Sequence, residues 1–474
     1  MVSNLGMRST LSWLSIIAIV FASTRPEAQA ESSPDERLWQ QLSKRCSSLY
    51  QEKRYGEAKE ACQVALDAAK KAFGPEDLHV ADALDELAAV HHLKKDYSDG
   101  EALYLEALAT HENIHTAEHP ASAKVLYDLA ELYRDQGNLS EALEAHQRVL
   151  KIREKRLNPD DKDVEDSQQM VAYLLYAQGR YAEALPFYEQ QLARVEKQGQ
   201  INETTLLQSL ETLMNTARQA GLYEHALKSA QRAKGIAETV YGPQHPATIS
   251  YLNAQAWLTY MLGRLKEARQ LYEELLVAQE KLYGDKHFAL VETLDALAWL
   301  SMLEGRYEES VTRSRRALSI IESTRGTEDP SVPLHLNSIG SVLTLQGHMS
   351  EAAPLFQQAL ALREKLHGEH NPSLMGDVLN LAGILELQGK FLEAQQMYQR
   401  AIALLEKADG ADAVQVAHVL NALAWSYLKG GQVADACQAY DQAAKILEKK
   451  PEASAFLATI SVHQAQCQSA ASSP

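Results

Sequence analysis

The chain has 474 residues, 46% of them apolar and 23% charged, with 23 Gly and 14 Pro, a composition that excludes a mainly disordered or collagenous protein. Asp and Glu (63) outnumber Lys and Arg (46), and the resulting net charge of -17 argues against a general binder of nucleic acid backbones. The four Cys contain no CxxC pair, which argues against a Cys-based zinc site.

The first thirty residues predict a segment for export. Arg8 precedes an apolar stretch of 12 residues from Leu11 to Ala22, and Ala28-Gln29-Ala30 fits the small-x-small pattern of a cleavage site. We therefore expect residues 1–30 to be a Sec-type signal peptide, and the mature chain to be periplasmic or secreted. Because about 20 apolar residues are needed to span a bilayer, an uncleaved anchor is the weaker alternative, and we expect no membrane span in the mature chain.

A single period organises residues 31–450. A small residue recurs every 42 positions in ten copies, and in this sequence it stands at Ala58, Gly100, Ala142, Ala184, Ala226, Ala268, Ser310, Ala352, Ala394 and Ala436. A period of 20–50 residues indicates a solenoid or a propeller rather than separate globular domains. Apolar residues inside each copy follow a 3.6-residue spacing, which favours helices over strands.

Each copy predicts two helices, which the ninth copy illustrates. Asn371 can cap a first helix, called helix A here, whose first residue is Pro372. Gly389 then ends helix A in the left-handed conformation. A second helix, helix B, carries the small residue Ala394 and ends near Gly410. Because small residues let the two helices approach closely, each hairpin needs its neighbour to bury its apolar face.

These copies resemble the tetratricopeptide repeat, specifically the 42-residue variety of the kinesin light chain. The likeness is carried by the sequence from Gly242 to Pro246, by LNALA at 420–424, by QGKFLEA at 388–394 and by EAAPLFQQALALREK at 351–365. The resemblance implies an all-α, right-handed superhelical solenoid of about ten helix-turn-helix hairpins. It also implies a concave surface that binds proteins or peptides. Lys53 and Lys95 depart from the pattern, because they replace the Gly of the turn.

The end of the chain predicts a cap. Pro451 interrupts the last copy, and residues 451–468 are expected to form one more amphipathic helix that covers the last hairpin. Residues 469–474 are expected to form a short disordered tail.

Two pairs of Cys are placed to close the terminal hairpins. Cys46 and Cys62 are each eight residues from the turn near Arg54, so they face each other at the same level. Cys437 and Cys467 lie at nearly equal distances from the turn after the tenth copy. Because export permits oxidation, we expect the disulfides Cys46–Cys62 and Cys437–Cys467.

The sharpest enzymatic pattern is the HExxH at 111–115. In a helix, His111 and His115 could bind zinc while Glu112 acts as a general base, which defines the alternative function of a metal-dependent hydrolase. However, Glu recurs in the column of Glu112 in most copies, so this residue belongs to the repeat template. We therefore expect a solvated helix end here, with no catalytic residue, no metal and no cofactor.

A second stripe on helix A is the candidate binding surface. One column of this stripe holds aromatic residues, and the column four residues earlier holds Asn or Asp. Aromatic rings offer contact area at little entropic cost, and Asn amides can both donate to and accept from a peptide backbone. The alternative is that the Trp residues pack between hairpins and the Asn residues bond along their own helices. The candidate residues are Asn253, Trp257, Tyr260, Asp295, Trp299, Asn337, Asn421, Trp425, Tyr173 and Tyr176.

The sequence therefore predicts an exported, non-catalytic scaffold that holds a peptide or another protein in its concave groove. Nucleic acid is not expected as a partner. Self-association through the solenoid is a third hypothesis.

Overall fold

The structure is a computed structural model that describes residues 33–197, 202–410 and 413–471. The expected signal peptide, residues 1–30, lies outside the described residues. In the part of the chain that is described, 21 α-helices and three short 3-10 helices occur without a strand, which confirms the all-α prediction.

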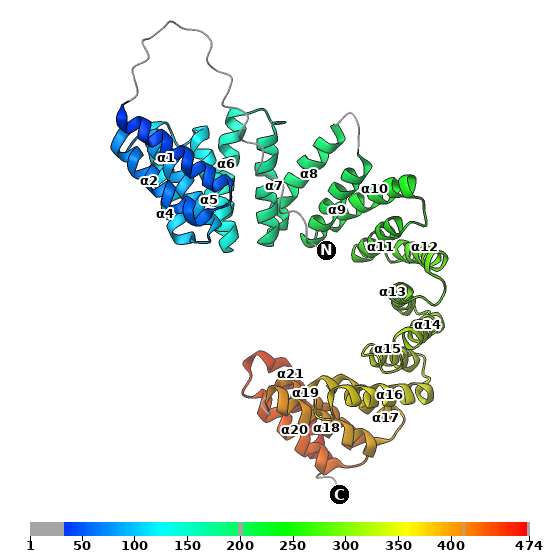
Figure 1. Cartoon of the computed structure of the whole chain (residues 1–474). Coiled ribbons are helices and arrows are strands. Elements are labelled where there is room, and N and C mark those ends of the chain that lie inside the picture. The colour runs from blue at the N-terminus through cyan, green and yellow to red at the C-terminus, as the bar shows by residue number, and fades with distance from the viewer. Residues whose placement is uncertain (1–32, 198–201, 411–412, 472–474) are drawn as a thin grey trace. The chain divides into compact units, whose positions relative to one another are not determined.

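Within each unit, consecutive helices pack against one another, as α1 does with α2 and α19 with α20 (Figure 1). The chain divides into two compact units, one ending at Phe187 and the other beginning at Tyr188. The helices up to this boundary are α1 (Pro34–Gln51), α2 (Tyr55–Phe73), α3 (Leu78–Leu93), α4 (Tyr97–Ile114), α5 (Pro120–Gln136), α6 (Leu139–Arg156), α7 (Lys162–Ala177) and α8 (Tyr181–Lys197), the last of which crosses it.

The helices of the second unit complete the repeat. They are α9 (Glu203–Gln219), α10 (Tyr223–Tyr241), α11 (Pro246–Met261), α12 (Leu265–Tyr283), α13 (Val291–Leu303), α14 (Tyr307–Arg325), α15 (Val332–Leu345), α16 (Met349–His367), α17 (Met375–Leu387), α18 (Phe391–Asp409), α19 (Val414–Lys429), α20 (Val433–Leu447) and α21 (Ser454–Ala471). Odd-numbered helices from α1 to α19 are helix A of a copy, and the even-numbered helices are helix B. None of the described helices combines the length and the hydropathy that a membrane crossing requires.

The small-residue column lies at the closest contact between helices. Ala58, Ala142, Ala226 and Ala268 have no exposed surface. At Gly100 an added Cβ would lie 3.0 Å from a methyl carbon of Leu132 and 3.4 Å from the backbone of α3, so even Ala is tight there. The close approach that the repeat predicts is therefore a real steric limit at this copy.

Buried apolar side chains form cores that continue from one hairpin to the next. One cluster extends from Cys46 in α1 to Ile152 in α6. A second cluster extends from Val311 in α14 to Cys467 in α21. Each hairpin thus contributes half of a layer that its neighbour completes.

Helix A begins with a capped turn, as the ninth copy shows. The side chain of Asn371 accepts a hydrogen bond from the backbone N–H of Ser373 at 2.9 Å, which confirms the predicted cap. Residues Pro372–Leu374 form a 3-10 turn, and the α-helix itself begins at Met375. Because the N–H of Leu374 bonds to the carbonyl of Asn371, the first turn is tighter than an α-helical turn.

The turns of the first two hairpins have the left-handed geometry without Gly. Lys53 and Lys95 have φ of 61° and 64°, and Gly221 in the corresponding turn of a later copy has φ of 74°. A Cβ in this region costs about 1 kcal/mol or more, because it approaches the following carbonyl oxygen. The departure from the repeat pattern therefore changes the strain of the turn and not its shape.

Replacing the strained Lys should stabilise the first unit. We expect Lys95→Gly to raise the free energy of unfolding by about 1 kcal/mol in chemical denaturation, since Gly removes the Cβ from a left-handed residue. Lys94→Gly is the matched control, because Lys94 has φ of -80° and Gly there only adds chain entropy to the unfolded state. Equal effects of the two substitutions would contradict the strain argument.

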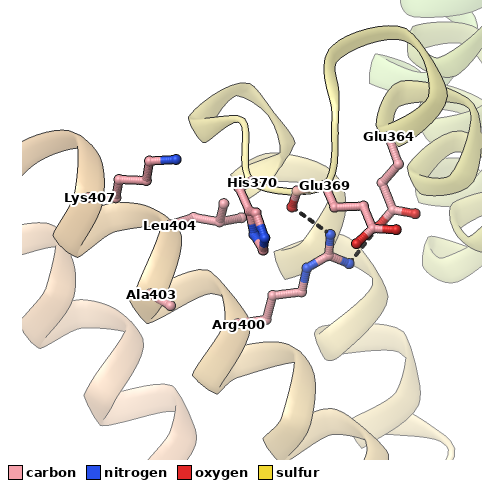
Figure 2. A pocket seen from close by; sticks show the side chains of 7 residues that line it. All are labelled: Glu364, Glu369, His370, Arg400, Ala403, Leu404 and Lys407. Atoms are coloured by element: carbon pink, nitrogen blue, oxygen red, sulfur yellow. Dashed lines mark hydrogen bonds and ion pairs between the residues drawn. The ribbon is translucent and has the colours of Figure 1, made fainter.

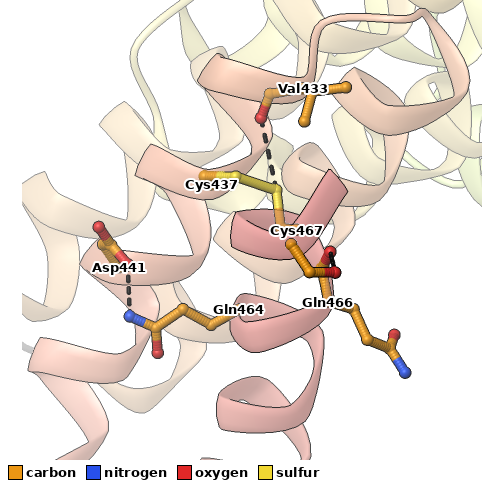
Figure 3. Close-up of a disulfide and its surroundings, with 7 residues drawn as sticks. Val433, Cys437, Asp441, Gln464, Gln466 and Cys467 are labelled. Atoms are coloured by element: carbon orange, nitrogen blue, oxygen red, sulfur yellow. Dashed lines mark hydrogen bonds between the residues drawn. A yellow bond between two sulfur atoms is a disulfide. The ribbon is translucent and has the colours of Figure 1, made fainter. Parts of the chain in front are cut away.

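Both predicted disulfides are present in the structure. Cys46 in α1 and Cys62 in α2 are bonded, with their Cα atoms 4.8 Å apart. Cys437 in α20 and Cys467 in α21 are bonded with a Cα separation of 5.6 Å (Figure 3). Close to this second bond, Gln464 donates a hydrogen bond to the carboxylate of Asp441 at 2.5 Å. Both disulfides thus join the outermost pairs of helices in the described chain.

The last helix is longer than the sequence predicts. It packs against α20 and continues to Ala471, three residues past the expected boundary at 468. Residues 469–471 were expected to begin the disordered tail, and this expectation is wrong for them. Ser469 and the two Ala that follow contain nothing that breaks a helix, which accounts for the extension.

Removing the first disulfide should destabilise the N-terminal hairpin. The bond closes a loop with a sequence separation of 16 residues. In the chain-entropy model, such a loop contributes about 3 kcal/mol to the free energy of unfolding. We expect Cys46→Ser/Cys62→Ser to show this loss in denaturant titrations of the oxidised protein. Peptide mapping of the unreduced wild type checks the premise, and four free thiols would refute both pairings.

Candidate functional site

The candidate residues lie on helix A of five hairpins and divide between the two units. Tyr173 and Tyr176 belong to α7 in the first unit. The other eight belong to α11, α13, α15 and α19 in the second unit.

Two Trp side chains of the aromatic column are largely open to solvent. Trp299 is 48% exposed, and its indole N–H donates a hydrogen bond to the hydroxyl of Tyr260 at 2.9 Å. Trp425 is 46% exposed, and the Nζ atom of Lys429 lies 4.8 Å from its ring centroid. Each indole is held by a polar contact while about half of its surface is free for a partner.

Trp257 has a different environment. It is half-buried, and the ring of Tyr223 meets it edge to face with the centroids 5.9 Å apart. The guanidinium of Arg218 lies 5.7 Å from the ring centroid on another side. Trp257 therefore packs against the preceding hairpin, as the alternative interpretation of the column requires.

The polar column joins successive A helices. A carboxylate oxygen of Asp295 in α13 lies 3.0 Å from Nε2 of His335 in α15. The amide of Asn337 in α15 donates to Asp377 in α17, which also pairs with Arg363 at 2.6 Å. The alternative in which the Asn residues bond along their own helices is therefore wrong for Asn337. Asn253 and Asn421 are half-buried.

His335 is held as an imidazolium. Burial alone lowers its pKa, but hydrogen bonds to Asp295 and to the carbonyl of Ser331 outweigh burial, and the pKa ends above the ordinary value of 6.5. Both partners are acceptors, so both ring nitrogens act as donors. The contact between α13 and α15 is thus strongest when His335 is charged.

This contact predicts a pH-dependent stability. Because the folded pKa is raised, the contribution of His335 is complete below about pH 6.5 and is lost as the pH rises through the folded pKa. We expect the difference in melting temperature between wild type and His335→Gln to shrink from about pH 6 to about pH 9. His348→Gln, at an exposed imidazole, is the control. A difference that stays constant with pH would contradict the imidazolium assignment.

A second apolar column was missed by the sequence interpretation. The last residues of α11, α13, α15 and α17 are Met261, Leu303, Leu345 and Leu387. They are 39%, 47%, 60% and 56% exposed. Their spacing of 42 residues was visible in the sequence, but the spacing of the repeat does not indicate whether an apolar column is buried or exposed. Because Leu303 follows Trp299 by four residues, the two side chains share one helix face.

The two Tyr of the first unit form a smaller aromatic group. Tyr173 is 51% exposed. Tyr176 is half-buried and meets Tyr181 of α8 edge to face, with ring centroids 5.0 Å apart.

The HExxH segment was expected to be a solvated helix end, and this expectation is wrong for His111. His111 is buried, and its Nε2 atom lies 3.9 Å from a carboxylate oxygen of Asp82. Glu112 is paired with Arg148 of the next helix B. Helix α4 ends at Ile114, and the rings of His111 and His115 have their centroids 6.5 Å apart. No group of three or more potential metal ligands converges among the described residues.

A surface depression of about 520 Å³ lies between helices α16 and α18 (Figure 2). Arg400 in its wall pairs with Glu364 at 2.5 Å and donates to the carbonyl of Glu369 at 2.9 Å. Its lining residues are Glu364, Glu369, His370, Arg400, Ala403, Leu404 and Lys407. None of these is a candidate residue of the helix A stripe, and the guanidinium in the wall is already neutralised.

Family models of the tetratricopeptide repeat match most of the described chain. One model matches residues 80–155, 205–281, 300–365 and 374–449. A second model of the same repeat matches residues 170–202.

Curated relatives share parts of the chain. Protein KINESIN LIGHT CHAIN-RELATED 3 of Arabidopsis thaliana is 24% identical over 229 residues, which are 48% of this chain and 35% of that protein. A clustered mitochondria protein homolog of Aspergillus terreus is 24% identical over 181 residues, 38% of this chain and 11% of that protein. The chain therefore spans about a third or less of the length of these relatives.

Two solved structures are similar to parts of this chain. BtubC (BKLC) from P. vanneervenii is 22% identical, with a TM-score of 0.40 over 48% of this chain and 91% of that one. A putative kinesin light chain of Podosopora anserina with nearly identical TPR-like repeats is 22% identical, with a TM-score of 0.39 over 43% of this chain and 96% of that one.

Proposed function

We propose that this chain is a non-catalytic scaffold that holds a peptide or an extended protein segment on helix A of its second unit. The premise is that the chain belongs to the tetratricopeptide repeat family. Proteins of this family serve as protein-interaction scaffolds. The kind of partner, a peptide or an extended protein segment, and the location of the protein in the cell are both part of this proposal.

The observation that carries the proposal is the exposure of large apolar side chains on successive A helices. Met261, Trp299, Leu303, Leu345 and Leu387, called the apolar row here, come from α11, α13, α15 and α17. Each exposes between 39% and 60% of its surface. Contiguous exposed apolar surface on a soluble domain commonly marks an interaction site. Trp425 on α19 adds a further exposed ring.

The polar column supports the same surface. Because Asp295 and Asn337 hold neighbouring A helices together, the side chains of the apolar row are presented by a fixed framework. A rigid surface loses less entropy when a partner binds. An extended segment that crosses several A helices could therefore make one apolar contact per hairpin.

We propose that the scaffold acts outside the cytoplasm. The support is the pattern of residues 1–30 and the pairing of all four Cys, because disulfides persist in oxidising compartments.

The decisive experiment compares two Trp on neighbouring A helices. We expect Trp299→Ala to weaken partner binding about thirtyfold, since loss of an aromatic anchor typically costs about 2 kcal/mol, while the melting temperature changes little. Trp257→Ala is the matched control, because that ring packs on Tyr223 and its loss should lower the stability by about 3 kcal/mol. The partner is captured by crosslinking in the native envelope, and its affinity is then measured by titration.

Two results would count against the proposal. A large drop in melting temperature for Trp299→Ala with unchanged capture would make this Trp a structural residue. Light scattering that shows a dimer of the wild type and a monomer of the variant would assign the apolar row to a second copy of the chain.

A further inference from the structure

The apolar row crosses four neighbouring A helices of the second unit. Hydrogen bonds between side chains join each of these helices to the next. The bonded pairs are Trp299–Tyr260 between α13 and α11, Asp295–His335 between α13 and α15, and Asn337–Asp377 between α15 and α17. Helices that pack against each other have axes about 8–10 Å apart. Successive members of the row are therefore separated by about this distance.

The apolar surface is one side chain wide on α15 and α17. One helical turn before Leu345 stands Ser341, and one turn before Leu387 stands Gly383. A Cβ added at Gly383 would meet nothing within 4 Å, so the space above this position is open. A partner α-helix presents a wide apolar face, because its apolar residues recur at three and four positions and cover a stripe of about 100° or more. The narrow row therefore favours an extended occupant over a helix.

The separation of the A helices matches one extended conformation. In a β-strand, alternate side chains share a face, and they lie about 6.6 Å apart. In a polyproline II helix, three residues complete a turn with a rise of about 3.1 Å each, so every third side chain shares a face and lies about 9.3 Å from the last. A segment in the polyproline II conformation thus places one side chain on each member of the row.

The aromatic residues of α11 and α13 fit the same backbone. A polyproline II helix has no internal hydrogen bonds, so its carbonyl groups take donors from outside. Tyr260 accepts the N–H of Trp299, which leaves the hydroxyl proton of Tyr260 as a donor for such a carbonyl. Trp299 is also 48% exposed, and exposed aromatic surfaces bind proline-rich segments in other protein modules.

Charges beside the row are matched within the chain. Arg264, in the turn after α11, pairs with Glu224. Arg306, in the turn after α13, pairs with Glu304. A charged side chain of an incoming segment would give up water at these two helices without finding a free partner. Lys390, in the turn after α17, is exposed and remains solvated. An uncharged segment is therefore the electrostatic complement of the row.

We propose that the apolar row binds an uncharged, proline-rich segment of a partner protein in the polyproline II conformation, with an apolar side chain at every third position. Pro residues between the apolar ones hold the conformation, because their ring fixes φ close to the polyproline II value. A segment that is ordered before it binds loses little entropy, which suits a shallow surface. This inference rests on the proposed function and adds the conformation and the sequence pattern of the partner.

The test measures the binding of synthetic 12-residue peptides to the whole protein by fluorescence anisotropy. The periodic peptide consists of four copies of Leu-Pro-Pro. One control has the same composition with its Leu residues gathered at the two ends, and a second control keeps the Leu spacing but has Gly in place of every Pro. We expect the periodic peptide to bind about tenfold more tightly than either control, since it alone combines the spacing with the ordered backbone.

Substitutions in the protein assign this binding to the row. Leu345 is 60% exposed, so Leu345→Ser should leave the melting temperature nearly unchanged and weaken binding of the periodic peptide about tenfold. Leu392→Ser is the matched control, because Leu392 is 67% exposed but lies on α18, a helix B. We expect its affinity to equal that of the wild type. If Leu345→Ser does lower the melting temperature, Leu387→Ser replaces it, since that residue is 56% exposed.

Several results would overturn the inference. Equal affinities for the periodic peptide and its controls, or no binding of any of them, would remove the conformation and the pattern. Binding that Leu345→Ser leaves unchanged would place the peptide elsewhere on the chain. Tighter binding of a helical peptide with Leu at every seventh position would make the occupant a helix. Dimers in light scattering that dissociate in Leu345→Ser would assign the row to a second copy of the chain.

The failure of this inference can be told apart from the failure of the proposed function. If the periodic peptide fails while the native partner is still captured and is lost in Trp299→Ala, the proposed function stands and the pattern of the partner is wrong. If capture of the partner is also independent of Trp299, both proposals fail.

Discussion

The fold depends on the close contact between the two helices of each hairpin and the helices of its neighbours. Each copy has one residue at this contact whose side chain must be small. Ala58, Ala142 and Ala226 are completely buried, and at Gly100 even a methyl group would approach Leu132 to 3.0 Å. Because the apolar layers continue from hairpin to hairpin, no copy completes its own core. Stability is therefore a property of neighbouring pairs.

This dependence leaves the outermost helices with fewer contacts, and both disulfides are found there. Cys46–Cys62 joins α1 to α2, and Cys437–Cys467 joins α20 to α21. A disulfide within a terminal pair of helices stabilises that pair by limiting the freedom of the unfolded chain. It therefore compensates for the stabilising contacts that a further neighbouring hairpin would make. The same reasoning explains why none of the four Cys lies in the middle copies.

The A helices have two roles along the chain, one for each column of residues. Their polar column carries the bonds between successive copies, from Asp295 to His335 and from Asn337 to Asp377. Their apolar column contains the residues of the apolar row, which keep between 39% and 60% of their surface exposed.

The sequence by itself determined the period, the two helices of each copy, the turns and the pairing of the Cys. These follow from local rules, since a 3.6-residue pattern, a capping Asn371 and a turn glycine act within one copy. The left-handed turns at Lys53 and Lys95 were not predicted, because a side chain with a Cβ disfavours that conformation, and only the structure shows them.

Only the tertiary structure decided which candidate residues are free. Trp257 and Trp299 occupy one column of helix A. Trp257 contacts the side chains of Arg218 and Tyr223. One period of 42 residues later, where the equivalent neighbours of Trp299 stand, the sequence has Tyr260 and Leu265. The exposure of a side chain is set by residues about forty positions away, and periodicity within one copy carries no information about them. For the same reason the contact between Asp85 of α3 and Lys124 of α5 could be seen only in the structure.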